Sequence, residues 1–264
     1  MRWLLAASVL LASAAHAHEF WLLPSSFSPA VGQRVGLQLR VGEGWPGEAL
    51  PRDPARVVRF AWIDGAGERR VAGAAGAEPA GVARANLVGP AIAIYRSSDS
   101  LVTLDAELFE RYLRLEGLEA VSEHRRARGE SAAPGRELFS RSAKALVQVG
   151  GKEAPTAGFD RIAGLTLELV PLDAPQTLVA GAPLRLQLLQ LGQPLSGTLV
   201  KAFERDGGGR VEARTGVDGV ATLALPRLGD WMFSAVAMAE APAGSGADWK
   251  SIWAALTLRT GQAR

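Results

Sequence analysis

Short apolar segments separated by turn residues run through most of the chain, and they constrain its fold more than any other feature. In residues 35–41 every second residue is valine or leucine, the period-two pattern of a strand buried on one face. Turn pairs such as Asp64-Gly65 and Gly89-Pro90 close the strand-like segments. Further strand candidates in the first half are residues 57–63, 82–88, 91–95, 101–104 and 143–149.

The second half repeats this organisation after a glycine-rich stretch, residues 150–158, which is a linker by composition. Its strand candidates are residues 165–170, 184–188, 198–203, 211–215, 220–225, 231–238 and 252–258. Short strands with turns roughly every 8–12 residues are typical of β-sandwiches. We therefore predict an all-β protein of two β-sandwich domains, Ig-like or transthyretin-like, at residues 18–150 and 161–260, with a linker at 151–160.

One segment of the first half breaks the strand pattern. Apolar side chains in residues 108–113 repeat with a spacing of four, as on the buried face of a helix. Asp105 is suited to cap the start of that helix and Gly117 to end it. Residues 118–128 place acids early and bases late, which suits the dipole of a second helix. We predict a short α-helical insertion at residues 105–142 of the first sandwich.

The chain begins with the features of a cleavable export signal. Arg2 precedes an apolar run at residues 3–12 that is too short to span a membrane. Signal peptidases require small side chains one and three residues before the cut. Ala15-His16-Ala17 allows cleavage before His18, and Ser13-Ala14-Ala15 allows cleavage before His16. We take residues 1–17 as the signal peptide and keep both cuts open.

The signal predicts a periplasmic protein that is not embedded in the membrane after cleavage. The chain has no cysteine, so a lipid-anchored cysteine at the cleavage point is excluded, and disulfides contribute nothing to stability. A chain of this length can be stabilised by its hydrophobic cores alone. No later segment holds the run of about 18 apolar residues that a spanning helix needs.

Charge and motifs exclude several functions. Loss of Arg2 with the signal leaves 28 basic and 27 acidic residues, and no basic stripe or nucleic-acid motif is present, so nucleic acid is not an expected partner. The chain also lacks Gly-x-Ser-x-Gly, His-Glu-x-x-His and any cysteine nucleophile. We therefore expect a binding protein and not an enzyme.

Histidine is the residue type with the clearest ligand chemistry, and two of the three histidines lie at the cleavage site. Cleavage before His18 gives a terminal histidine whose α-amine and Nδ1 can chelate one metal ion. Cleavage before His16 gives a free amine with histidine third, a square-planar site made with two backbone amides. Both arrangements suit Cu(II) and Ni(II). The third histidine, His124, lies in the charged helix candidate and is the weaker candidate ligand.

Several motifs together are similar to a family of exported bacterial proteins commonly labelled NikM-like, the periplasmic component of cobalt/nickel uptake systems. They are His18-Glu19-Phe20-Trp21-Leu22, Arg40-Val41-Gly42-Glu43-Gly44 with Pro51-Arg52, Gly135-Arg136-Glu137-Leu138-Phe139-Ser140, and Asp248-Trp249-Lys250-Ser251-Ile252-Trp253-Ala254. Separately, Gly192-Gln193-Pro194-Leu195-Ser196-Gly197 and Thr215-Gly216-Val217-Asp218-Gly219 resemble the transthyretin-like or carboxypeptidase-regulatory-like sandwich. The family label implies metal transport and an inner-membrane transporter as partner.

These observations predict a periplasmic protein that binds or delivers nickel, cobalt or copper, with His18, His16 and His124 as candidate metal ligands. The alternative is an envelope scaffold in which tandem sandwiches contact a protein or carbohydrate and hold no metal. The processed terminus distinguishes the two, because only a metal-binding protein needs a free amine beside an intact His18.

Overall fold

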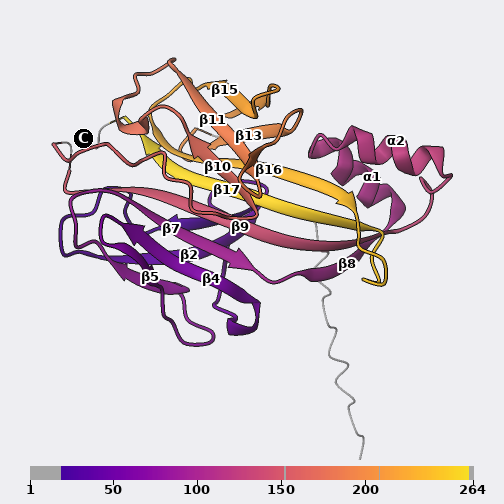
Figure 1. Cartoon of the computed structure of the whole chain (residues 1–264), viewed down its shortest axis with the longest axis horizontal. Coiled ribbons are helices and arrows are strands. Elements are labelled where there is room, and N and C mark those ends of the chain that lie inside the picture. Colours follow the sequence, from indigo (N-terminus) through magenta and orange to yellow (C-terminus); the bar gives the residue numbers. More distant parts are fainter. Residues whose placement is uncertain (1–18, 152, 208, 262–264) are drawn as a thin grey trace, which may run out of the picture.

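The computed structural model of the chain describes residues 19–151, 153–207 and 209–261. One long central sheet dominates the described part and runs through the whole molecule (Figure 1). Its strands, in spatial order, are β14 (Arg210–Arg214), β13 (Leu199–Glu204), β16 (Gly229–Glu240), β17 (Trp249–Thr260), β9 (Gly135–Val149), β7 (Gly89–Ser97), β4 (Val57–Asp64) and β5 (Gly67–Arg70), while β8 (Ser100–Leu104) also pairs with β9.

Two smaller sheets cover opposite faces of this central sheet. The first consists of β1 (Glu19–Pro24), β2 (Arg34–Gly42), β3 (Glu48–Leu50) and β6 (Gly81–Arg84). The second consists of β10 (Leu167–Pro171), β11 (Pro183–Gln190), β12 (Gln193–Pro194) and β15 (Val220–Ala224). Two short 3-10 helices, η1 (Pro54–Arg56) and η2 (Pro175–Thr177), lie in the connections.

Strand β7 shows how the central sheet serves two cores. Ala91, Ala93 and Tyr95 pack in the core under the first small sheet. Ile92 and Ile94, which point the other way because side chains alternate along a strand, pack in the core under the second small sheet. A strand buried on both faces reads as a continuous apolar run, which is the pattern of residues 91–95.

The two halves of the chain are joined by a parallel pairing of β9 with β17, in register from Trp249 opposite Glu137 to Thr257 opposite Ala145. The described residues of the predicted linker, 151–160, contain no strand. The central sheet nevertheless continues from one half of the chain into the other through this pairing. Strand periodicity indicates which residues are buried but not which strands pair, so the sequence could not predict the pairing of β9 with β17.

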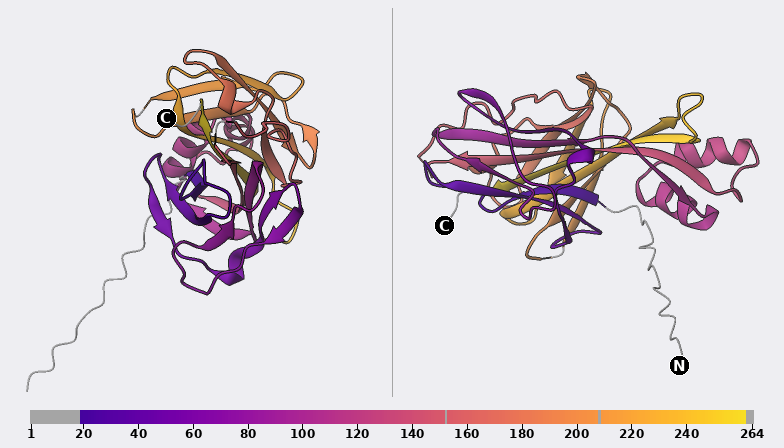
Figure 2. Two further views of the ribbon diagram at one scale, coloured as in Figure 1. Left: turned by 90° about the vertical axis from the view of Figure 1, so that its left-hand side faces the viewer. Right: turned by 90° about the horizontal axis from the view of Figure 1, so that it is seen from below.

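The helical insertion is a pair of helices, α1 (Ala106–Leu115) and α2 (Glu119–Ala127), at one end of the long sheet (Figure 2). Asp105 stands at the start of α1 but makes no side-chain capping bond. Strand β9 already begins at Gly135, so the last eight residues of the predicted insertion, 135–142, belong to the central sheet. Glu137 and Ser142 in this stretch are polar but buried, so the segment lacks the alternation of apolar and polar residues that identifies a strand in the sequence.

The predicted all-β class with a short helical insertion is confirmed by this arrangement. Each strand candidate of both halves overlaps a strand of the structure. Neither helix in the described part of the chain has the length and apolar character that crossing a bilayer requires.

Candidate functional site

A buried cluster of three charged side chains lies at the start of β1. The Lys201 ammonium on β13 is 2.5 Å from Glu19 Oε1 and 2.6 Å from the Glu116 carboxylate. The three side chains are only 3–6% exposed. Because β1, β13 and the end of α1 come from distant parts of the sequence, the cluster ties the amino-terminal strand, the helical insertion and the second half together.

The end of α1 explains why Glu116 reaches the sheet. Gly117 takes a left-handed φ of +68°, and its N–H donates to the Arg114 carbonyl while Leu118 N–H donates to the Leu113 carbonyl. This is the Schellman pattern of helix termination, which favours glycine. A Cβ at position 117 would lie 2.8 Å from Leu199 Cβ on β13. Glycine therefore permits both the turn and the close approach.

Burial raises the pKa of Glu116 from 4.5 to about 7. The Lys201 charge opposes this shift, and repulsion from the Glu19 carboxylate adds to it. A buried carboxylate resists ionisation because it loses its hydration. Glu116 therefore exchanges its proton near neutral pH, and the cluster carries one net negative charge when both carboxylates are ionised.

Replacing Glu116 by glutamine is expected to flatten the pH dependence of stability. Because the folded-state pKa is raised, the native state binds the extra proton, so its stabilisation is complete below about pH 4.5 and is lost as pH rises through about 7. Urea unfolding between pH 8.5 and 5 should show the wild type gaining up to about 3 kcal/mol relative to Glu116→Gln.

The control is Glu119→Gln, which removes an exposed carboxylate paired with Arg214 and should leave the pH slope unchanged. Glu137, another buried acid with a raised pKa, is present in all three proteins and cancels in the comparison. Identical slopes for the wild type and Glu116→Gln would contradict the assignment.

The three candidate metal ligands are not brought together in the described part. His16 and His18 lie outside the described residues. His124 lies on α2, where its Nε2 is 3.0 Å from Glu240 Oε1, and its ring packs edge-on against Trp249. Arg128 donates to the same Glu240 carboxylate at 2.6 Å. Within residues 19–151, 153–207 and 209–261, no three His, Cys, Asp or Glu side chains are arranged to hold a metal ion.

A second buried polar group joins the helical insertion to the sheet. Tyr112 donates its hydroxyl to Glu137 at 3.0 Å, the Ser251 hydroxyl donates to the same carboxylate, and Trp253 Nε1 donates to Ser251 at 3.2 Å. The Tyr112 and Trp253 rings stack with centroids 5.7 Å apart. Burial raises the pKa of Glu137. Sequence patterns cannot reveal this cluster, because parallel pairing of β9 with β17 is what brings Glu137 and Ser251 together.

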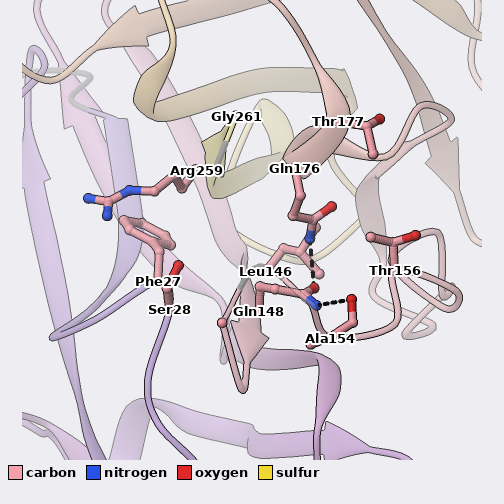
Figure 3. A pocket seen from close by; sticks show the side chains of 11 residues that line it. Phe27, Ser28, Leu146, Gln148, Ala154, Thr156, Gln176, Thr177, Arg259 and Gly261 are labelled. Carbon is pink, nitrogen blue, oxygen red and sulfur yellow. Dashed lines mark hydrogen bonds between the residues drawn. The ribbon is translucent and has the colours of Figure 1, made fainter. Parts of the chain in front are cut away.

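A small cavity of about 100 Å³ lies at the other end of β9. Figure 3 shows Gln176 and Gln148 meeting there, with Gln176 Nε2 donating to Gln148 Oε1 at 2.9 Å. Gln148 in turn donates to the Pro155 carbonyl at 2.9 Å. A cavity this small has room for a few water molecules, and the glutamines hold the chain crossover against the sheet.

The fold and the cluster define an all-β protein whose amino-terminal strand is anchored by buried charges. The chain belongs to a family described as a domain of unknown function (DUF4198), whose model matches residues 15–239. No curated protein matches this chain closely enough to count as a relative.

Two solved structures are similar at low sequence identity. The D0-D1 domain of intimin is 11% identical, with 92% of this chain and 98% of that chain covered and a TM-score of 0.20. A tetra-tandem repeat in the extending region of a large adhesion protein is 15% identical, with 92% and 49% covered and a TM-score of 0.21.

Proposed function

We propose that this protein acts in the periplasm, where it binds or delivers nickel, cobalt or copper through the amino terminus exposed by signal cleavage. The observation that carries the proposal is the anchoring of Glu19, whose carboxylate is buried against Lys201. Successive Cα atoms are about 3.8 Å apart. In the sequence, position 18 is bonded directly to Glu19, so a histidine that ends the processed chain there would be the neighbour of this anchored residue.

The chemistry of the terminus supports a transition metal. After cleavage before His18, the α-amine and the imidazole offer two nitrogen ligands from one residue. After cleavage before His16, the amine, two amides and the His18 imidazole offer four. Nitrogen ligands of this kind favour Cu(II) and Ni(II) over hard cations. Above about pH 7, where Glu116 is ionised, the Glu19, Glu116 and Lys201 cluster carries one net negative charge, which attracts a cation.

The choice among metals and the partner rest on resemblance. The amino-terminal motif beginning at His18 resembles that of exported proteins labelled NikM-like components of cobalt/nickel uptake, which supports nickel or cobalt and an inner-membrane transporter as partner. The chain lacks Gly-x-Ser-x-Gly, His-Glu-x-x-His and any cysteine nucleophile, which supports a binding role for the chain rather than catalysis.

Replacing His18 by alanine is expected to abolish tight metal binding and leave folding nearly unchanged. Loss of a metal ligand's outer-shell partner alone costs about 10–100-fold in affinity, so loss of the ligand should cost at least about 100-fold. Protein exported and processed in a bacterial periplasm should be used, with intact mass to establish the cut. Calorimetric titration with Ni(II), Cu(II), Co(II) and Zn(II) then measures the affinity.

Two comparisons make this experiment specific. His124→Ala, which removes the half-exposed helix histidine, should keep wild-type affinity, and blocking the α-amine should reproduce the loss seen in His18→Ala. Equal affinity in the His18→Ala protein would reject the terminal site. Affinity no tighter than that of a generic histidine peptide in the wild type would favour the envelope-scaffold alternative.

A further inference from the structure

We propose that a pocket between β1, β9 and the junction of β7 with β8 binds small organic carboxylates that carry an apolar body. The pocket has a volume of about 320 Å³, within reach of the 300–1,000 Å³ of common small-molecule sites. Its central feature is the Arg141 guanidinium. The inference is independent of the metal proposal, because no histidine is among the residues that line this pocket.

Arg141 is an arginine held by aromatic rings instead of by a carboxylate. Its guanidinium carbon lies 4.9 Å from the ring centre of Phe20 and 5.2 Å from that of Phe139. No carboxylate of the described residues forms a salt bridge with it. Glu137, on the same strand, is instead bound by Tyr112 and Ser251. A guanidinium has five donors in a fixed fork that matches a carboxylate, so Arg141 is available for an external anion.

The fold creates this position by interrupting the sheet. Residue 96 on β7 pairs with Ser142, and Ser100 on β8 pairs with Phe139, so the β7–β8 side holds one residue more than β9 between these pairs. Such a bulge breaks the ladder and redirects side chains. The Arg141 N–H, at the break, donates to Ser97 Oγ at 2.9 Å. The pocket opens beside this irregularity.

The polar groups around Arg141 favour an anion. Arg56, at the mouth, donates to Ser100 Oγ at 2.6 Å and lies 3.3 Å from Asp53. Asp53 is the one carboxylate among the lining residues. It already accepts a hydrogen bond from the Ala55 N–H, in addition to its ion pair with Arg56. Burial lowers the pKa of Arg141 to about 10, with Tyr95 and Glu137 opposing the shift and the Arg56 charge adding to it, so Arg141 remains a cation at neutral pH.

The walls favour a ligand with an apolar body rather than a bare inorganic ion. Phe20, Leu39 and Tyr95 line the pocket, and each of these residues is at most 6% exposed. Leu50 and Pro51 complete the apolar surface. Burying the body of a ligand against such walls contributes about 25 cal/mol per Å². Inorganic phosphate or sulfate gains nothing from these contacts.

Titration of the mature protein with 3-phenylpropionate tests the proposal, with the neutral 3-phenylpropanamide as matched probe. The acid should bind and the amide should bind at least about tenfold more weakly, because only the acid pairs with the guanidinium. Arg141→Gln should lose at least about tenfold in affinity for the acid, whereas Arg185→Gln, an exposed arginine paired with Asp173, should bind as the wild type does.

Thermal unfolding establishes that each variant is folded. If Arg141→Gln does not fold, Arg56→Gln, which removes the second cation lining the pocket, should weaken binding several-fold. Equal binding of acid and amide, or wild-type affinity in all pocket variants, would overturn the assignment. Inorganic phosphate binding as tightly as 3-phenylpropionate would overturn the requirement for an apolar body.

Discussion

Replacing Lys201 by methionine is expected to destabilise the protein by about 3–5 kcal/mol at pH 8. The change keeps the length and apolar stem of the side chain but removes the ammonium that lies 2.5 Å from Glu19 and 2.6 Å from Glu116. Two buried carboxylates are then left without their shared cation. Urea unfolding followed by circular dichroism measures the loss.

The pH dependence distinguishes this mechanism from a packing defect. At pH 5 the loss should shrink, because Glu116, whose pKa is already raised to about 7, takes up a proton and no longer needs a counter-ion. Lys250→Met is the matched control, since Lys250 pairs with Asp99 at an exposed position and such pairs contribute at most about 1 kcal/mol. A Lys201→Met deficit that is the same at both pH values would refute the electrostatic explanation.

Replacing Glu168 by glutamine is expected to cost about 3–5 kcal/mol at neutral pH. Lys144 on β9 lies 2.7 Å from Glu168 on β10, and both side chains are 1% exposed. The same carboxylate accepts the N–H groups of Ala163 and Leu165 at 2.7 and 3.1 Å. The Glu168 carboxylate therefore holds residues 163–168, which follow the linker, against strand β9 of the central sheet. Glutamine leaves the Lys144 ammonium buried without a counter-ion, although its bond to the Arg161 carbonyl remains.

A double variant separates the lost charge from the lost shape. Lys144→Met with Glu168→Leu removes both charges, so the part of the loss that comes from the buried charge should return. The cost of leaving the Ala163 and Leu165 N–H groups without an acceptor should remain. Asp173→Asn, which weakens a surface pair with Arg185, should change the free energy of unfolding by less than about 1 kcal/mol. If the double variant is no more stable than Glu168→Gln, the two backbone N–H bonds of Glu168 account for the effect instead.

Much of the fold could be predicted from the sequence, because the spacing of apolar residues within a segment shows which face of a strand or helix is buried. The alternation in residues 35–41 corresponds to β2, and Gly117 ends α1 as its position after the helical repeat predicts. The start of β9 at Gly135 was missed, because Glu137 occupies a buried strand position that patterns assign to apolar residues. Such exceptions mark positions where a polar group has partners elsewhere in the fold.

The candidate sites could be predicted less well from the sequence than the fold. Histidine chemistry pointed to His18 and His16, which lie outside the described residues, and His124 proved to pair with Glu240 on a helix surface. The cluster around Lys201 and the pocket around Arg141 have no sequence signature. Their members come from strands that pair only in the folded chain.

The sequence by itself determined the β-rich class, the helical pair and the buried faces, since these follow from periods of two and of about 3.6 residues within single segments. Only the tertiary structure decided that β9 and β17 pair in parallel, so that one sheet serves both halves. It also brought Lys201 between Glu19 and Glu116 and exposed Arg141 to a pocket. The physical reason is that strand pairing and charge pairing join residues far apart in sequence, while local patterns record burial alone.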